Sequence, residues 1–313
     1  MTGPDGVAVN DVPEPDASAG VLIDVHTAGL AFPDVLLTRG LYQYKPDPPF
    51  TLGVEVAGTV AEADADSGFE AGQRVMAFTF GAASERLAVG PEFVFAAPES
   101  FDDDQAGGFV MNYHTSHFAL HHRGRLQEGE TVLVHGAAGG VGTAAVQIAT
   151  GAGAHVIAVV SSDAKEEVAR RAGADEVVRS DGEWLKHVRE LTDGRGVDVL
   201  YDPVGGDRFA DSVRALAPEG RLLVVGFTEG NIPSVAVNRL LLKNISVVGV
   251  AWGAFVGDKP GLTRDIGQDL ARLAEAGFVD PIVSATYPLE EGAQALRDID
   301  ERRATGKLVL RLR

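Results

Sequence analysis

Cysteine is absent from the 313-residue sequence. Its absence excludes disulfides, cysteine-ligated zinc and thiol nucleophiles, so any redox chemistry requires a bound cofactor. The sequence also lacks an uninterrupted apolar run of the ~18 residues that a membrane span needs. The first residues carry neither the basic nor the apolar region of a secretory signal. We therefore expect a cytoplasmic protein.

Basic residues are few compared with acidic ones. The chain has 27 Lys and Arg against 45 Asp and Glu, which gives a net charge of −18. Binding to nucleic acid depends mainly on cationic contacts with phosphate, and anionic membranes also attract basic surfaces. The charge therefore argues against both nucleic acid and membrane partners. A role in solubility is sufficient to explain the acidic surface.

The segment 131–142, Thr-Val-Leu-Val-His-Gly-Ala-Ala-Gly-Gly-Val-Gly, organises the chain. An apolar run typical of a buried strand is followed by a small-residue turn and then by helix formers, as in a dinucleotide-binding βαβ unit. Gly139 would let the backbone approach a pyrophosphate, and Gly142 would let the helix pack on the strand. Ala137 stands where this fingerprint usually begins with glycine. A merely tight strand–helix turn is the alternative. Cofactor contacts are predicted at Ala138, Gly139, Gly140, Val141 and Gly142.

Two patterns of secondary structure divide the chain. Closely spaced short strands with Gly and Pro turns predict a β-rich domain at the N-terminus. After residue 131, strands alternate with helices, which predicts a doubly wound parallel sheet with its ligand at the carboxyl ends of the strands. The strand-like ending, 306–312, is expected to return to the first domain. The predicted domains are a β-rich domain from residues 1–102 and 252–313 and a Rossmann domain from 103–251.

Five segments, in this order, resemble the medium-chain dehydrogenase/reductase superfamily and, within it, the zinc-free quinone oxidoreductase family, which uses NADPH. The segments are 28–34, 53–58, 137–142, 202–206 and 240–244. The resemblance covers nearly the whole chain. It implies a GroES-like substrate domain built from both chain ends around a central Rossmann domain, with the active site in the cleft between them, and it implies a homodimer. Relatives usually start with an extra strand before Gly3, so we expect an open sheet edge.

The end of the second Rossmann strand indicates which dinucleotide binds. An NAD enzyme would place Asp or Glu there, whereas this chain reads Ser161-Ser162-Asp-Ala-Lys165. The hydroxyls and the lysine suit a 2′-phosphate, and in the resembling family this pattern binds it. Arg179 could supply a further contact by charge. The alternative is a serine helix cap with a solvated lysine, and Asp163 adds negative charge nearby. The predicted cofactor is NADP(H).

The resemblance also implies contacts at the nicotinamide end of the cofactor. Gly226 and Phe227 end the strand that would pass the ring, and Trp252 would border the same ring. Core packing is the alternative for both aromatic residues. The full set of implied contacts is Asn112, Thr115, Gly226, Phe227, Trp252 and Gly253.

The substrate cleft is expected along the loop that carries Tyr42 and Tyr44, together with Trp252. Tyr42 is the first candidate for a catalytic contact, either as a donor to a developing oxyanion or as an aromatic wall. Relatives often carry Asn where this chain has Ala31, which puts any mechanism that uses that side chain in doubt.

No metal site is predicted. Zinc-dependent relatives need a Cys, and they need a His where this chain has Val54. Four histidines share one predicted helix and could in principle bind a metal, but a packed or solvated face explains them better. They are His114, His117, His121 and His122.

These observations predict an NADPH-dependent reductase that transfers hydride to quinones or related α,β-unsaturated carbonyls without a metal. One alternative is an enoyl-thioester or alkenal double-bond reductase, which needs the same hydride delivery. Another is a non-catalytic NADPH-binding protein, which the change to Ala31 slightly favours. The expected partner in each enzymatic case is a small quinone or enone.

Overall fold

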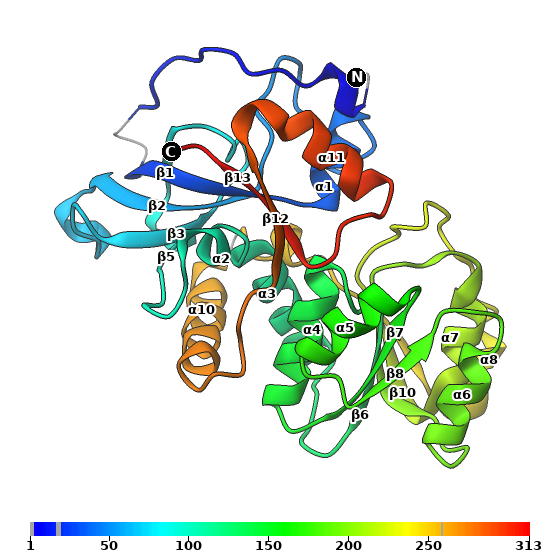
Figure 1. Cartoon of the computed structure of the whole chain (residues 1–313). Helices are drawn as coiled ribbons and strands as arrows, with labels where there is room; N and C mark the ends of the chain where they lie inside the picture. Colours follow the sequence, from blue (N-terminus) through cyan, green and yellow to red (C-terminus); the bar gives the residue numbers. More distant parts are fainter. Residues whose placement is uncertain (1–2, 17–19, 258) are drawn as a thin grey trace. The chain divides into compact units, whose positions relative to one another are not determined.

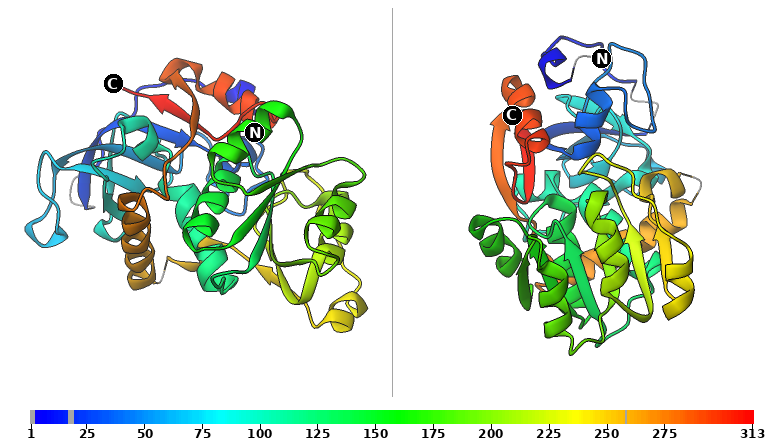
Figure 2. Two further views of the ribbon diagram at one scale, coloured as in Figure 1. Left: turned by 60° about the horizontal axis from the view of Figure 1, so that its bottom comes forward. Right: turned by 90° about the vertical axis from the view of Figure 1, so that its right-hand side faces the viewer.

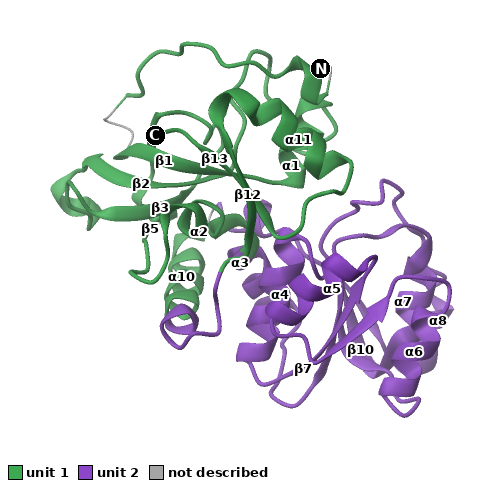
Figure 3. Cartoon of the chain, in the orientation of Figure 1, with its two compact units in different colours: residues 1–112, 259–271, 281–313 green, residues 113–258, 272–280 purple. Residues whose placement is uncertain are grey.

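The computed structural model describes residues 3–16, 20–257 and 259–313, and the chain forms two compact units (Figures 1 and 3). Unit 1 contains residues 1–112, 259–271 and 281–313, and unit 2 contains residues 113–258 and 272–280. Both chain ends thus belong to the same unit, as predicted. Among the described residues, no helix is both long and apolar enough to span a bilayer.

The sheet of unit 1 is organised around β1 (Val21–Leu30), which pairs with β13, β2 and β4. The main strand order is β12-β13-β1-β2-β3-β5. The other strands are β2 (Glu55–Glu62), β3 (Arg74–Phe78), β4 (Arg86–Val89), β5 (Val94–Ala96), β12 (Val283–Pro288) and β13 (Lys307–Arg311). Leu308 of β13 lies opposite Leu30 in an antiparallel ladder, so the predicted return of the chain end is confirmed.

Helices from both chain ends cover this sheet. α1 (Phe32–Thr38) and α11 (Gly292–Asp300) lie side by side (Figures 1 and 2), and Arg39 forms an ion pair with Asp300 at 2.5 Å. α10 (Pro260–Glu275) begins in this unit and ends in unit 2.

Helix α2 (Asp103–Gly107) extends unit 1 beyond residue 102. Asp102 caps the helix by accepting from the Gln105 N–H. The Thr27 hydroxyl of β1 donates to the Asp103 carbonyl at 2.6 Å. A Cβ on Gly107 would lie 2.2 Å from the same hydroxyl oxygen, so only glycine allows this approach. Contact with β1 is the reason that α2 belongs to unit 1.

Unit 2 contains a six-stranded parallel sheet in the order β11-β10-β9-β6-β7-β8. Its strands are β6 (Thr131–His135), β7 (His155–Val160), β8 (Glu176–Arg179), β9 (Val197–Asp202), β10 (Leu216–Val224) and β11 (Ser246–Gly249). Val132, Leu133 and Val134 are fully buried, as expected of a central parallel strand. The chain order of the strands reverses between β6 and β9, so the predicted doubly wound topology is confirmed.

The helices of unit 2 alternate with its strands. They are α4 (Gly140–Gly151), α5 (Asp163–Arg171), α6 (Trp184–Leu191), α7 (Phe209–Ala215), α8 (Asn238–Lys243) and α9 (Trp252–Phe255). α3 (Val110–His117) precedes the sheet and continues as a π-helix over Phe118–Arg123. Short 3-10 helices lie at Pro4–Gly6, Ala65–Ser67, Pro91–Phe93, Gly206–Arg208 and Leu289–Glu291.

Candidate functional site

The turn between β6 and α4 depends on two glycines. Gly136 follows the strand with φ at 58°, a conformation that favours glycine. Gly136 lies directly before Ala137, the first position of the fingerprint, and its conformation was not predicted. A Cβ on Gly142 would lie 2.2 Å from the Gly136 carbonyl oxygen and 2.8 Å from the Ala137 Cα. Gly142 therefore has the predicted role of close helix–strand packing.

The backbone beside Gly139 is open. Gly139 precedes the first residue of α4, and a Cβ there would meet only the Gly136 carbonyl oxygen, at 3.4 Å. Ala138 is buried, whereas Gly139, Gly140 and Val141 are partly exposed. The turn lies at the carboxyl end of β6, beside β9, where parallel sheets bind ligands. Its free N–H groups can hold an anion.

The predicted phosphate contacts lie at the same edge of the sheet. Val160 at the end of β7 is paired in register with Arg179 at the end of β8, and Ser161 follows directly. Ser162 caps α5 by accepting from the Lys165 N–H at 3.4 Å. The Lys165 ammonium donates to the Ser161 hydroxyl at 3.3 Å. The serine cap is therefore present, and it coexists with the cation that a 2′-phosphate needs.

Arg179 is engaged by two carboxylates. Its Nη2 donates to Asp163 Oδ1 at 2.5 Å and to Glu166 Oε2 at 2.6 Å. The negative charge of Asp163 near this site was predicted, whereas that of Glu166 was not. Glu166 reaches Arg179 only because β8 lies beside β7.

Phe227 lies on a turn that is fixed to the end of β9. The Gly226 N–H donates to the Asp202 carbonyl at 3.4 Å, and the Thr228 N–H donates to the Pro203 carbonyl at 3.1 Å. A Cβ on Gly205 would lie 2.9 Å from the Phe227 ring. Gly226 and Phe227 are half-buried and lie at the carboxyl edge of the sheet.

The remaining predicted cofactor contacts are mostly buried. The Trp252 side chain is 1% exposed, with its ring centroid 5.2 Å from that of His114. In this structure the ring packs in the core of unit 2, whereas Gly253 is exposed. Asn112 and Thr115, on α3, are 4% and 9% exposed.

Tyr42 lies on the loop that follows α1, near a buried carboxyl group. Asp34 Oδ2 accepts from the Ala31 N–H and Asp34 Oδ1 accepts from the Gly53 N–H, both at 2.8 Å. Burial raises the pKa of Asp34 to about 6. Partial burial, and then the charge of Asp34, raise the pKa of Tyr42. Tyr42 is therefore a protonated phenol at neutral pH. The role of Asp34 in holding this loop was not predicted from the sequence.

Tyr44 lies on the same loop and packs on Phe80, with ring centroids 4.6 Å apart. Both rings are partly exposed. Phe80 in turn contacts Phe78, which is buried, so the exposed pair is connected to the core of unit 1.

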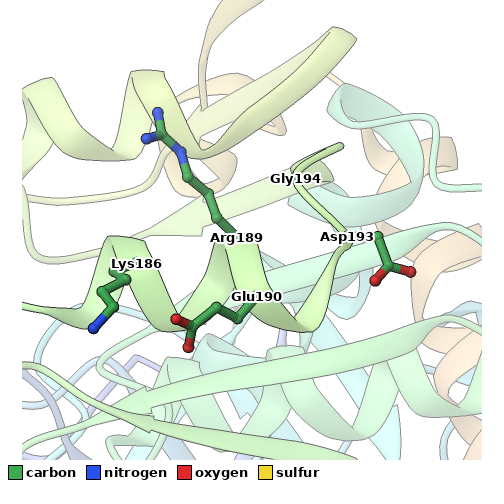
Figure 4. A pocket seen from close by; sticks show the side chains of 5 residues that line it. All are labelled: Lys186, Arg189, Glu190, Asp193 and Gly194. Atoms are coloured by element: carbon green, nitrogen blue, oxygen red, sulfur yellow. The ribbon is translucent and has the colours of Figure 1, made fainter.

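A surface hollow of about 470 Å³ lies at the end of α6 (Figure 4). Its lining consists of Lys186, Arg189, Glu190, Asp193 and Gly194. The chain passes from this hollow into the start of β9, so the hollow lies at the amino edge of the sheet, opposite the glycine turn. None of the predicted site residues lines it.

Two families match the chain. The Alcohol dehydrogenase GroES-like domain matches residues 17–113, and the Zinc-binding dehydrogenase family matches residues 140–274. Zinc does not fit the residues present. The chain has no cysteine, and the part of it that the structure describes contains no group of three His, Asp or Glu side chains that could hold a metal ion.

Individual relatives are similar over nearly the full chain. Quinone oxidoreductase-like protein 2 of Rattus norvegicus is 39% identical, over 96% of this chain and 87% of that protein. A probable oxidoreductase from Mycobacterium abscessus is 47% identical with a TM-score of 0.91, and the match covers 99% and 96% of the two chains.

The names of two further solved structures state an activity, and one of them also states a bound cofactor. Escherichia coli quinone oxidoreductase, solved with NADPH, is 26% identical with a TM-score of 0.89 over 99% and 97% of the two chains. The CurK enoyl reductase is 27% identical with a TM-score of 0.86 over 97% and 94%. The glycine turn, the two-unit fold and these matches agree. The chain is an oxidoreductase and belongs to the quinone oxidoreductase family of the medium-chain dehydrogenase/reductase superfamily.

Proposed function

We propose that this chain is an NADPH-dependent reductase of quinones or related α,β-unsaturated carbonyls. One observation carries the proposal: the glycine turn and the Ser161–Lys165 cluster lie at the same carboxyl edge of the unit 2 sheet. The turn suits a pyrophosphate and the cluster suits a 2′-phosphate. The quinone oxidoreductases among the relatives support the choice of acceptor.

The residues present fit NADPH. The open side of Gly139 leaves room for the pyrophosphate, and the N-terminus of α4 favours its charge. Ser161 and Lys165 supply a hydroxyl and a cation for the 2′-phosphate. Phe227, fixed over Gly205, can border the nicotinamide.

NADPH, when bound, supplies the hydride, and the protein supplies orientation and a proton donor. Tyr42 is our candidate donor to the oxyanion that develops on the acceptor. Like any tyrosine, Tyr42 keeps its proton at neutral pH, so it can donate a hydrogen bond there. Tyr44 and Phe80 provide aromatic surface on the same unit, which suits a planar acceptor.

An enoyl-thioester or alkenal reductase is the second candidate. It is favoured by the likeness to an enoyl reductase. We also propose a homodimer. β11 is an edge strand, and near it Val237, Leu241 and Leu242 are 75%, 75% and 76% exposed. Light scattering of the purified protein tests the dimer.

A panel of acceptors tests the function. NADPH oxidation is followed spectrophotometrically with quinones, alkenals and enoyl-thioesters in parallel. Turnover with quinones supports the proposal, and turnover with enoyl-thioesters alone supports the second candidate. Tight NADPH binding without turnover of any acceptor would instead indicate a binding protein.

A further inference from the structure

In this structure, Nη2 of Arg179 has no hydrogen left to donate to a phosphate. Both Nη2 hydrogens are directed at carboxylates, one at Asp163 and one at Glu166. Nη1 is buried and has no hydrogen-bond partner among the described residues. A phosphate at Ser161 must therefore displace a carboxylate before it can pair with this guanidinium at Nη2.

The two carboxylates hold Arg179 unequally. The Asp163 side chain is fully exposed, and exposed ion pairs contribute little. Glu166 is less exposed, and its other oxygen accepts from Arg170 Nε at 2.9 Å. Glu166 thus bridges two arginines within α5 and β8. It is the stronger of the two competitors for Arg179.

We propose that Glu166 weakens the preference for NADPH over NADH by opposing the 2′-phosphate. The inference rests on the proposed NADPH function. The negative charge of Glu166 occupies Arg179 and repels an incoming phosphate at the same sheet edge. NADH carries no such phosphate and does not meet this opposition. Ser161 and Lys165 favour NADPH over NADH, and Glu166 therefore reduces the difference in affinity between the two coenzymes.

Glu166→Gln isolates the charge. The glutamine keeps one acceptor oxygen, for Arg170 or for Arg179, and the negative charge is removed. We expect adenosine 2′,5′-bisphosphate and NADPH to bind about 1.5- to fivefold more tightly, the range expected of one surface charge. 5′-AMP and NADH, which lack the 2′-phosphate, should bind with unchanged affinity.

Isothermal titration calorimetry measures these affinities without turnover. Glu167→Gln is the matched control, because it makes the same charge change at the neighbouring, exposed position of α5. We expect less than half the effect there. In an Arg179→Met background, Glu166→Gln should lose most of its gain, because the competition is for that guanidinium.

Equal or weaker binding of the bisphosphate to Glu166→Gln would overturn the inference. Weaker binding would mean that Glu166 positions Arg179 for the phosphate. If the unmodified protein binds the bisphosphate better than 5′-AMP but Glu166→Gln gives no gain, only this inference fails. If the unmodified protein binds neither NADPH nor the bisphosphate, the proposed function fails with it.

Discussion

Lys307 places its ammonium on the carboxylate of Glu55, although 252 residues separate them in the chain. Both side chains are buried. The other Glu55 oxygen accepts from the Met111 N–H at 2.8 Å, in the first turn of α3. A Cβ on Gly108 would lie 2.6 Å from Lys307 Cγ, so the glycine makes room for the lysine. The pair connects β13, β2 and α3 within unit 1.

Breaking this pair should be costly. Lys307→Met leaves the Glu55 carboxylate buried without its cation, and we expect the free energy of unfolding to fall by about 3–5 kcal/mol. Glu55→Gln together with Lys307→Met removes both charges and retains an acceptor for Met111, so most of the loss should be recovered. Urea denaturation measures both. An equal loss in the single and double variants would contradict an electrostatic origin.

Two glycines of the β6–α4 turn should respond differently to alanine. Gly142→Ala forces a Cβ against the Gly136 carbonyl, and we expect a loss of about 1–3 kcal/mol of stability. Gly139→Ala has room in the protein, so the fold should be retained. Its methyl would occupy the open side where the pyrophosphate approaches, and NADPH binding should weaken about tenfold or more. Thermal unfolding and calorimetry separate the two effects. Unchanged NADPH affinity in Gly139→Ala would exclude this site.

His135 should make the fold sensitive to acid. It is fully buried, and its Nε2 shares a hydrogen bond with the Ser212 hydroxyl at 2.9 Å. Burial lowers the pKa of His135 from 6.5 to about 3. Because the folded state keeps the neutral imidazole, its contribution to stability is present above pH 6.5 and is lost as the pH falls towards 3. The loss approaches about 1.4 kcal/mol per pH unit.

His135→Gln should flatten the pH dependence of the unfolding free energy in this window. Urea denaturation over a pH series measures it, with His155→Gln at an exposed position as the control. The carboxyl group of Asp34 gives the opposite pH dependence of the unfolding free energy. Its pKa is raised to about 6, so its contribution is present below pH 3.8 and is lost as the pH rises through 6. A slope in His135→Gln as steep as in the unmodified protein would show that the imidazole is not the titrating group.

Local patterns predicted the elements well. The Asp102–Gln105 cap acts within a single turn, and so do the Ser162 cap and the glycine turn, so their sequences alone determine them. The return of β13 to β1 followed from the family resemblance and from the strand-like ending. The parallel, doubly wound sheet of unit 2 followed from the alternation of its strands with helices.

Contacts between distant segments were not predictable from one sequence. The partnership of Glu55 with Lys307 requires β2, β13 and α3 to be assembled first. The pairing of Glu166 with Arg179 depends on β8 lying beside β7. The packing of Trp252 against His114, which belong to different segments of the chain, was likewise not predictable. The positive φ of Gly136 could not be predicted from the fingerprint, because this residue lies directly before its first position, Ala137.

The most direct test of the account is the coenzyme dependence of quinone reduction in Lys165→Ala. The initial rates of NADPH and NADH oxidation are compared in the variant and in the unmodified protein. We expect the unmodified protein to prefer NADPH, and the variant to lose NADPH activity while its activity with NADH is retained. A preference of the unmodified protein for NADH, or an equal loss with both coenzymes in the variant, would contradict the assignment of Ser161 and Lys165 to the 2′-phosphate.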